Sequence, residues 1–178
     1  MKLLIIIDMQ NDFIDGVLGT EEAKKIVPRV RARIEEARRE GIPVIATQDT
    51  HGPDYLSTRE GRLLPVPHCI RGTQGWQIAP ELQECLRGCT VVEKDNFATM
   101  ALTDRIREVA DDLSGLEIEI AGLCTDICVV NNAMVLRMTF PESTIRVLAS
   151  CCAGVTPEKH LAALEVMKSC QILVEGEE

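Results

Sequence analysis

Two cysteines four residues apart, Cys124 and Cys128, follow a short β-rich segment at 117–122. A disulfide scaffold, a metal site, two buried thiols or a catalytic nucleophile would each fit this pattern. Cys128 falls in the first turn of a helix expected to begin near Thr125, with Thr125 or Asp126 as its cap. Free backbone N–H groups and the positive end of the helix dipole would lower the pKa of a thiol there. We therefore expect Cys128 to be the nucleophile and Cys124 a turn residue, with a buried structural thiol as the alternative for Cys128.

Charged side chains lie at the ends of three other β-rich segments. Asp8 follows KLLIII, Asp49 ends IPVIATQD, and Lys94 lies in TVVEKD. In a parallel sheet the carboxyl ends of the strands share one edge, so these side chains and Cys128 are expected to converge. A carboxylate, a lysine and a cysteine together suit nucleophilic catalysis. Each charge taken alone also has a simpler explanation, because strands end at the protein surface.

A second group of side chains has the composition of a metal site. Asp49 and His51 are two residues apart at the end of a predicted strand, and His68 returns to them from the long loop that follows. One carboxylate and two imidazoles suit a divalent ion such as zinc, iron or manganese, and Glu60 in the same loop could add an oxygen ligand. Two solvent-exposed loop histidines are the alternative. The third histidine, His160, is expected on the surface of a late helix.

The elements that would position these residues alternate between strand-like and helical patterns. We expect strands at 2–8, 42–49, 90–95, 117–122, 144–149 and 171–176, and helices at 20–41, 101–113, 125–138 and 156–169. This alternation predicts a three-layer α/β/α fold with a central, mostly parallel sheet of about six strands. One domain over residues 1–178 is expected from the chain length. The Pro- and Gly-rich segment 50–75 interrupts the alternation, and its length and histidines indicate a functional loop.

Composition argues against several classes of function. The 178-residue chain has a formal net charge of -9, and its basic residues at 29–40 are interleaved with glutamates, which is unlike a nucleic-acid-binding surface. No apolar run approaches the ~20 residues of a membrane span. The apolar run after Lys2 is too short for a signal peptide, so we expect a cytoplasmic protein with reduced thiols. The eight cysteines include no CxxC pair, which argues against a structural zinc site.

Five stretches carry a resemblance that spans nearly the whole chain. They are LLIIIDMQNDFIDG, ATQDTH, PVPHCIRGTQGW, VVEKDNF and IAGLCTDICVVNNA, with a further match in CCAGVTPEKHLAALEVM. In this order they closely resemble the nicotinamidase/isochorismatase-like cysteine hydrolase superfamily. The resemblance implies the isochorismatase-like hydrolase fold and a catalytic triad of Asp8, Lys94 and Cys128. It also implies a cis peptide bond before Cys124, with the backbone N–H groups of Cys124 and Cys128 forming an oxyanion hole.

The resemblance extends to cofactor and assembly. Asp49, His51 and His68 match the metal ligands of the nicotinamidase branch, and Glu60 resembles a fourth ligand found in some members. A divalent metal ion is therefore implied, with zinc as the leading candidate and iron or manganese as alternatives. The resemblance also implies a homo-oligomer, a dimer or larger, that acts on a small molecule and binds neither nucleic acid nor a membrane.

The implied reaction is hydrolysis of a small amide through a thioester, with nicotinamide as the leading substrate. Two positions depart from the nicotinamidase pattern, because Pro65 replaces a common tryptophan and Ile127 replaces the histidine or tyrosine that often precedes the catalytic cysteine. Phe13 would cover one face of a substrate ring, with simple loop packing as its alternative. Leu64, Pro65 and Phe97 would form a looser opposite wall.

Other functions stay open at this point. An amidase for another small amide, a carbamoyl compound or maleamate is the nearest, but those branches generally lack the metal set that His51 and His68 supply. Isochorismatase proper hydrolyses a vinyl ether and lacks the nucleophile, so Cys128 argues against it. A non-catalytic binding or redox-sensing module on the same fold would not need Asp8 and Lys94.

Overall fold

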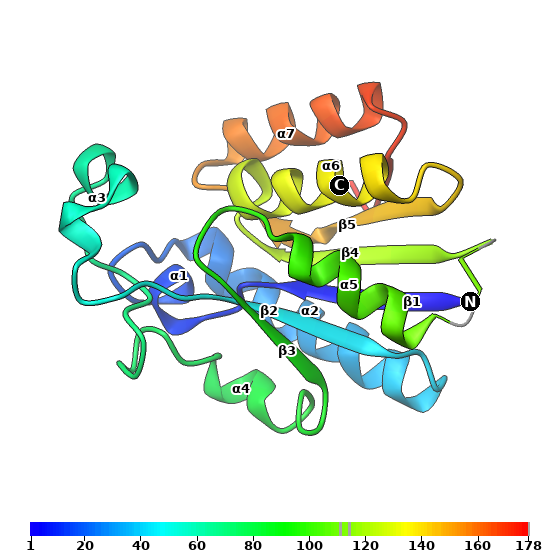
Figure 1. Ribbon diagram of the computed structural model, residues 1–178, viewed down its shortest axis with the longest axis horizontal. Coiled ribbons are helices and arrows are strands. Elements are labelled where there is room, and N and C mark those ends of the chain that lie inside the picture. Colours follow the sequence, from blue (N-terminus) through cyan, green and yellow to red (C-terminus); the bar gives the residue numbers. More distant parts are fainter. Residues whose placement is uncertain (111, 114, 178) are drawn as a thin grey trace.

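A six-stranded sheet forms the centre of the molecule (Figure 1). The computed structural model describes residues 1–110, 112, 113 and 115–177. All neighbouring strands run parallel in the order β3-β2-β1-β4-β5-β6, which confirms the predicted α/β fold. The strands are β1 (Lys2–Ile7), β2 (Val44–Asp49), β3 (Thr90–Lys94), β4 (Glu117–Leu123), β5 (Thr144–Ala153) and β6 (Leu173–Glu175).

Helices cover both faces of the sheet and complete three layers. One face carries α2 (Glu21–Arg39) with the short α1 (Asn11–Ile14) and α4 (Pro80–Gln83). The other face carries α5 (Met100–Val109), α6 (Val130–Thr139) and α7 (Pro157–Ser169). In Figure 1, α2 lies behind the sheet and α5 and α6 lie in front of it. The direction of travel across the sheet reverses after β3, and right-handed crossovers then place the later helices on the opposite face.

The first strand shows why the sequence forms a buried parallel sheet. Leu3, Ile5 and Ile7 pack into the core beneath α5, α6 and α7, whereas Leu4 and Ile6 pack into the core beneath α2. Alternate side chains of a strand point to opposite faces, so a strand covered on both faces requires a continuous apolar run. The apolar run Lys2–Ile7 is therefore one of the two central strands of the sheet.

The helix α2 follows the predicted pattern closely. The Thr20 side chain accepts a hydrogen bond from the Ala23 N–H and caps the helix. Its buried positions repeat at helical spacing and face the sheet: Ala23, Ile26, Val27, Val30, Ile34 and Ala37. After the helix ends, Gly41 has a φ of +69°, a conformation that glycine adopts readily.

Three elements differ from their predicted extents. The helix predicted at 101–113 ends at Val109, because Ala110 is extended; Asp111 of that prediction lies outside the described residues. The helix predicted at 125–138 begins instead with a π-helical turn, Thr125–Val129, that continues into α6. Strand β5, predicted at 144–149, runs on to Ala153 because it continues alongside β4 after an irregularity in their pairing.

The segment predicted as a loop at 50–75 contains short helices. Tyr55–Ser57 form a 3₁₀ turn, and Arg59–Leu63 form α3, which projects from the body of the molecule in Figure 1. The side chain of Thr58 accepts a hydrogen bond from the Gly61 N–H and caps α3. Helices of four or five residues, such as α1, α3 and α4, are too short to show the periodic pattern by which longer helices are predicted.

Across the described ranges, no helix combines the length and apolar character needed to cross a membrane. The long α2, with 19 residues, carries exposed glutamate, lysine and arginine side chains on its outer face.

Candidate active site

Polar side chains meet where the strand order reverses, between β1 and β4. Asp8 directly follows β1, and Asp49 and Lys94 end the paired strands β2 and β3. The turn that carries Cys128 follows β4, the other neighbour of β1. In open α/β sheets the carboxyl edge at such a reversal is the usual ligand site. The convergence predicted from the strand ends is therefore present.

Lys94 is the centre of this group. Its Nζ lies 2.7 Å from Asp8 Oδ2 and 3.1 Å from Asp49 Oδ1, and it is 3.6 Å from Cys128 Sγ. It also donates a hydrogen bond of 3.0 Å to the carbonyl oxygen of Asn96. The side chains of Asp8 and Lys94 are completely buried, so their charges are held without direct access to water.

The buried charges determine which groups hold protons. Burial alone would lower the pKa of Lys94, but Asp8, Cys128 and Asp49 raise it well above its usual value, so the ammonium persists. Burial raises the pKa of Asp8, and Lys94 opposes that rise. A carboxylate that is held beside an ammonium and whose pKa is raised is suited to take up a proton during a reaction.

The expectation that the helix start lowers the pKa of Cys128 is wrong. Burial raises the pKa of this thiol well above its usual value, and the carboxylate of Asp8 raises it further, although Lys94 acts in the opposite direction. The resting thiol is therefore protonated. It can become a nucleophile only when a base removes its proton as it reacts, and Asp8 is the base that it faces.

Asp8 has an unusual backbone conformation and a fixed side chain. Its φ is +46°, in the left-handed region that is uncommon for residues other than glycine. The Asp8 N–H donates to Thr47 Oγ1 at 3.2 Å, and the Thr47 hydroxyl donates to Asp8 Oδ1 at 2.7 Å. Thr47 therefore holds one carboxylate oxygen while Lys94 faces the other.

The turn after β4 has the predicted cis peptide bond, between Leu123 and Cys124. The carbonyl oxygen of Cys124 accepts hydrogen bonds from the N–H groups of Ile127 (3.0 Å) and Val129 (3.1 Å), which close the π-helical turn. Before the turn, a side chain at Gly122 would meet the Ile7 carbonyl oxygen at 2.1 Å, so only glycine allows β4 to lie this close to β1.

The predicted caps of this helix are wrong, and so is the surface position of His160. The Thr125 hydroxyl lies 2.7 Å from His160 Nδ1, and Asp126 Oδ1 accepts a hydrogen bond from the Val155 N–H. Thr125 thus contacts α7 itself and Asp126 the segment that leads into it, and neither side chain caps its own helix. His160 is half-buried because of this contact.

The predicted metal ligands form a compact group beside Lys94. One ligand atom each from Asp49, His51 and His68 lie within 4.8 Å of one another, and all three residues are buried. Burial alone would raise the pKa of Asp49, but His51 and Lys94 beside it lower the pKa below its usual value, so this carboxylate is charged. Glu60 Oε1 lies 3.8 Å from His51 Nε2 and 3.7 Å from His68 Nε2, which places it at the edge of the group.

The histidines present free ring nitrogens to the centre of this group. His68 Nδ1 contacts the Val66 carbonyl oxygen at 2.9 Å, which leaves Nε2 to face Asp49 and Glu60. The buried His51 Nε2 lies 3.0 Å from Asp49 Oδ2, but its geometry does not make a hydrogen bond with any described residue. A buried polar atom without a partner is costly, and a cation bound between these side chains would satisfy it. The donor set fits a zinc-type site with one carboxylate and two imidazoles.

Two cavities that share part of their lining lie beside Cys128 and the candidate metal ligands. A small chamber of about 50 Å³ is lined by Asp49, His68, Cys124, Cys128 and the apolar residues Phe13, Leu18, Leu64, Phe97 and Ile127, with Glu60. An outer cavity of about 660 Å³ shares Glu60, Leu64, Phe97 and Ile127 with the chamber and also reaches His51. These four shared residues separate the thiol from the outer cavity, so they are placed to control what reaches it.

The predicted substrate-contact residues are only partly brought together. Phe13 packs against His68, with 5.6 Å between ring centroids, and Leu64, Phe97 and Ile127 line the chamber. Pro65, in contrast, is exposed and lines neither cavity. The loop turns at Leu64, and it is this side chain that faces inward.

Three buried residues of the site were not predicted. Thr47 holds Asp8, as described above. Gln10 bridges the carbonyl oxygens of Asp49 and Trp76 through its amide nitrogen, and its amide oxygen accepts from the Asp49 N–H. Asn132 donates to the carbonyl oxygens of Phe97 and Cys128 and so links the chamber wall to the turn that carries Cys128. No local signal in the sequence identifies these residues, because each contacts a group that is distant in the chain.

Comparison with known proteins agrees with this architecture. A sequence model of the isochorismatase domain matches residues 2–178. The nicotinamidase/pyrazinamidase of Mycobacterium tuberculosis is 27% identical over 192 residues, which cover 97% of each chain. The pyrazinamidase of Pyrococcus horikoshii, whose crystal structure is a complex with zinc, superposes with a TM-score of 0.81 at 26% identity and 99% coverage of both chains.

A relative with a different substrate is also similar. The N-carbamoylsarcosine amidase of Thermoplasma acidophilum superposes with a TM-score of 0.77 at 26% identity, covering 99% of this chain and 98% of the other. The likeness thus extends over the whole fold and is shared by amidases with different substrates. Because the domain match spans nearly every residue, the chain belongs to the isochorismatase family.

Proposed function

We propose that this protein is a cysteine-dependent amidohydrolase that cleaves a small aromatic amide, with nicotinamide converted to nicotinate and ammonia as the leading reaction. The observation that carries this proposal is the position of Lys94, whose Nζ contacts both the Asp8 carboxylate and the Cys128 thiol, and Cys128 lines the small chamber. A base, a balancing cation and a nucleophile in contact are the components that covalent amide hydrolysis requires.

In the first half of the reaction, Asp8 takes the proton from the Cys128 thiol as the sulfur adds to the amide carbonyl. The carbonyl oxygen becomes an oxyanion, which the backbone N–H groups of Cys124 and Cys128 would stabilise. One such donor typically contributes ~3–4 kcal/mol to the transition state. Because the thiol is protonated at rest, proton transfer and addition are coupled, and no free thiolate accumulates.

In the second half, the oxyanion collapses and the C–N bond breaks. Asp8 returns its proton to the departing nitrogen, which leaves as ammonia, and the acyl group stays on Cys128 as a thioester. Asp8 then takes a proton from a water molecule as that water adds to the thioester carbonyl. Collapse releases the carboxylic acid, and Asp8 reprotonates the Cys128 sulfur. Lys94 keeps its proton throughout and offsets the negative charge that moves between Asp8 and Cys128.

A divalent metal ion, most simply zinc, would be held by Asp49, His51 and His68, with Glu60 near enough to join them after a small movement. When bound, such an ion supplies a Lewis-acidic contact beside the chamber, suited to a ring nitrogen or a water molecule. The P. horikoshii relative, whose crystal structure is a complex with zinc, supports this assignment, as does the buried grouping of Asp49, His51 and His68. The protein's own residues carry every proton-transfer step described above.

A second candidate is an amidase for a non-aromatic amide or a carbamoyl compound. Two observations favour it: Pro65, at the position of a common nicotinamidase tryptophan, is exposed, and the similar T. acidophilum protein is an N-carbamoylsarcosine amidase. The chamber lining near Leu64 is apolar, and Pro65 supplies no aromatic ring to it, so Phe13 and Phe97 are its aromatic side chains. Loss of one stacked aromatic contact costs ~0.5–1.5 kcal/mol, which raises KM several-fold without preventing the reaction.

Steady-state ammonia release distinguishes the two candidates. Nicotinamide would be compared with pyrazinamide, with aliphatic primary amides of similar size and with N-carbamoyl amino acids. The proposal predicts the highest kcat/KM for the pyridine and pyrazine amides, with a raised KM. A clear preference for an aliphatic or carbamoyl substrate would reject the nicotinamide assignment and leave the cysteine amidohydrolase assignment in place. A Cys128→Ala sample carried through every assay identifies ammonia released by contaminating enzymes.

A further inference from the structure

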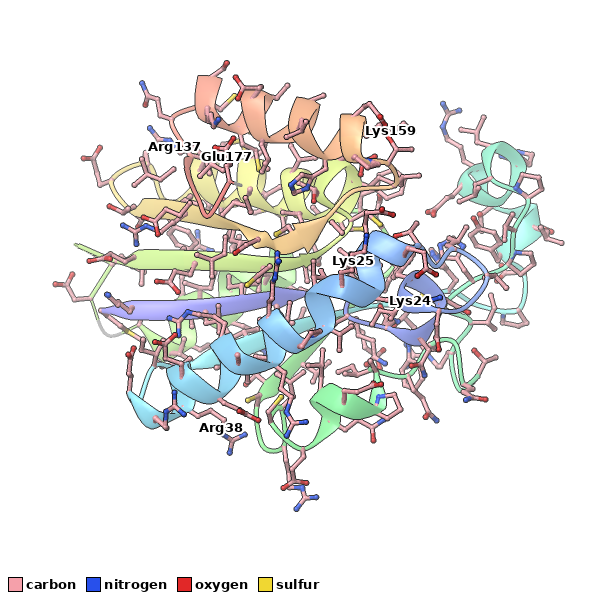
Figure 2. All side chains as sticks on the ribbon, turned by 180° about the vertical axis from the view of Figure 1, so that it is seen from behind. Lys24, Lys25, Arg38, Arg137, Lys159 and Glu177 are labelled. Carbon is pink, nitrogen blue, oxygen red and sulfur yellow. The ribbon has the colours of Figure 1, made fainter. Side chains whose placement is uncertain are left out.

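A second cavity lies away from the active site, between α2, β5 and α7. Its volume is about 380 Å³, and it shares no lining residue with the chamber or with the outer cavity. Both helices contact β5, and Figure 2 shows α2 crossing the near face of the sheet while α7 lies along its edge. Lys25 and Glu177, both labelled in Figure 2, lie at the rim of this cavity.

The cavity exists because β6 is shorter than β5. β6 pairs with β5 only at Arg146, Val147 and Leu148, whereas β5 continues to Ala153. Beyond Leu148, within the described part of the chain, the outer edge of β5 has no strand beside it. The residues that line this edge have small side chains, namely Ala149, Ser150, Ala153 and Gly154, so the space between α2 and α7 is not filled.

Among the described charged side chains around the cavity, the guanidinium group of Arg29 is the one that can bind a ligand carboxylate. Glu177, on one side, is paired with Lys168 at 2.7 Å, and Glu22 lies 3.8 Å from Lys25. Arg29 donates only to the Ser150 carbonyl oxygen, at 3.3 Å, and has no carboxylate partner among the described residues. Burial lowers the pKa of His160, so its imidazole is neutral near pH 7. The unpaired charge that faces the cavity is therefore positive.

We propose that the α2–α7 cavity binds a small molecule with an apolar body and a single carboxylate group. Ile26, Leu161 and Leu164 would contact the apolar body, and the Arg29 guanidinium would bind the carboxylate through two parallel N–H groups. The half-buried His160 adds a neutral ring at the inner end. The volume falls within the ~300–1,000 Å³ typical of small-molecule sites, and the combination of an apolar lining with a few polar groups is also typical.

The cavity wall is hydrogen-bonded to the turn that carries the proposed oxyanion hole. His160 lines the cavity and contacts Thr125, the residue that follows Cys124, at 2.7 Å. The N–H of Val155, which follows the lining residue Gly154, donates to Asp126 Oδ1. A ligand that displaces His160 would therefore disturb the turn, so occupancy is expected to change kcat. The expected change in kcat rests on the proposed amidase function, whereas binding of a carboxylate in the α2–α7 cavity does not.

Isothermal titration calorimetry with benzoate as the probe tests the binding site. Wild type would be compared with Arg29→Met, which removes the charge but keeps an apolar side chain, and with Arg31→Met as the matched control. Arg31 lies on the same helix, is exposed, pairs with Glu35 and does not line the cavity. We expect Arg29→Met to weaken one benzoate-binding event by roughly ten-fold or more, as expected for loss of a charge-assisted hydrogen bond, with Arg31→Met unchanged. Any benzoate bound in the active chamber would give the same heat in all three proteins.

Two results would overturn the site. The first is identical benzoate binding in wild type and both variants. The second is a change of subunit number in Arg29→Met, measured by light scattering, without a change in benzoate affinity, because the cavity would then be a contact between copies of the chain. A Leu161→Trp variant, which narrows the cavity from the exposed side of α7, should independently weaken the same event.

Turnover at saturating amide tests the connection to the active site. Benzoate that competes in the chamber raises KM but leaves kcat unchanged, whereas benzoate in the α2–α7 cavity is expected to change kcat in wild type and not in Arg29→Met. An unchanged kcat in wild type, with calorimetric binding present, would overturn the connection but not the binding site. Absence of turnover on every amide would reject the proposed function and leave the calorimetric result independent of it.

Discussion

The ammonium group of Lys94 is buried in contact with two carboxylates, Asp8 and Asp49, and the Cys128 thiol. Burial raises the pKa of Asp8, and the ammonium group of Lys94 opposes that rise and so favours the carboxylate. Without Lys94, Asp8 would take up a proton from solvent and would no longer be able to accept one from Cys128. The proposed proton transfer from Cys128 to Asp8 therefore requires the positive charge of Lys94.

Lys94→Met should therefore abolish ammonia release and also reduce stability. Removal of one partner from a buried ion pair typically costs ~3–5 kcal/mol, measured as the free energy of unfolding in urea. Lys24→Met is the matched control, because Lys24 forms an exposed pair with Glu21 that contributes little. Near-wild-type activity in Lys94→Met would contradict the role assigned to the ammonium group.

Thr47 is a positioning residue for Asp8. Thr47→Val keeps the shape of the side chain but removes the hydroxyl that donates to Asp8 Oδ1. Loss of a hydrogen bond to a charged group costs ~1.5–3 kcal/mol, so kcat should fall roughly ten-fold or more while KM changes little. Thr47→Ser, which restores the donor, should recover most of the rate. Equal kinetics in the Val and Ser variants would show that the hydroxyl does not position the base.

At the scale of elements, the loop between β2 and β3 supplies the candidate metal site. The buried Tyr55 ring packs against His51 and His68, with centroids 4.8 and 5.0 Å away, and its hydroxyl donates to the Leu64 carbonyl oxygen. Tyr55 therefore contacts both histidines and the backbone of Leu64, which lines the chamber. The position of the wall depends on the geometry of the histidines.

Purified protein should contain about one divalent ion per chain, measured by elemental analysis after dialysis. His51→Ala and His68→Ala should each lose most of this metal, because each removes one ligand of a three-residue set. His160→Ala is the internal control, because it changes the remaining histidine, which lies on α7. The same metal content in all four proteins would show that the ion, if present, binds elsewhere.

The contact between α7 and the turn that carries Cys128 should make stability depend on pH. Burial lowers the pKa of His160 in the folded protein, whereas an unfolded chain has a histidine pKa of about 6.5. Below that pH the unfolded state binds more protons, so the contribution of the neutral imidazole is present above pH ~6.5 and is lost as the pH falls toward the folded value. The Tm of wild type should therefore fall more than that of His160→Gln between about pH 7.5 and pH 5.5. Parallel Tm curves would contradict this.

For the whole molecule, the alternation of strands and helices and the motifs at the strand ends were sufficient to predict the fold and to identify the residues that meet at its carboxyl edge. Asp8, Asp49 and Lys94 were predictable because a parallel sheet brings strand ends together whatever the loops do. The inward orientation of Leu64 and the outward orientation of Pro65 were not, since they depend on the path of an irregular loop.

The residues missed from the sequence act over long separations in the chain. Thr47 bonds to Asp8 and Asn132 bonds to the Phe97 carbonyl, and neither pairing leaves a local pattern. The pKa of Cys128 was misjudged for a related reason. The helix start is visible in the sequence, but the extent of burial and the nearby carboxylate, which act in the opposite direction, emerge only when the chain is folded. The homo-oligomer implied by the family resemblance stays a prediction.

Formation of a thioester between Cys128 and an amide substrate is the step on which the proposed function depends. Acid-quenched enzyme, taken during turnover of nicotinamide or of the best substrate found in the amide panel, can be digested and mapped by mass spectrometry. We predict one acyl group attached to Cys128 in wild type and the same adduct in Cys124→Ala. A folded Cys128→Ala protein should show neither the adduct nor ammonia release. An acyl group on Cys124, or undiminished hydrolysis by Cys128→Ala, would contradict the account.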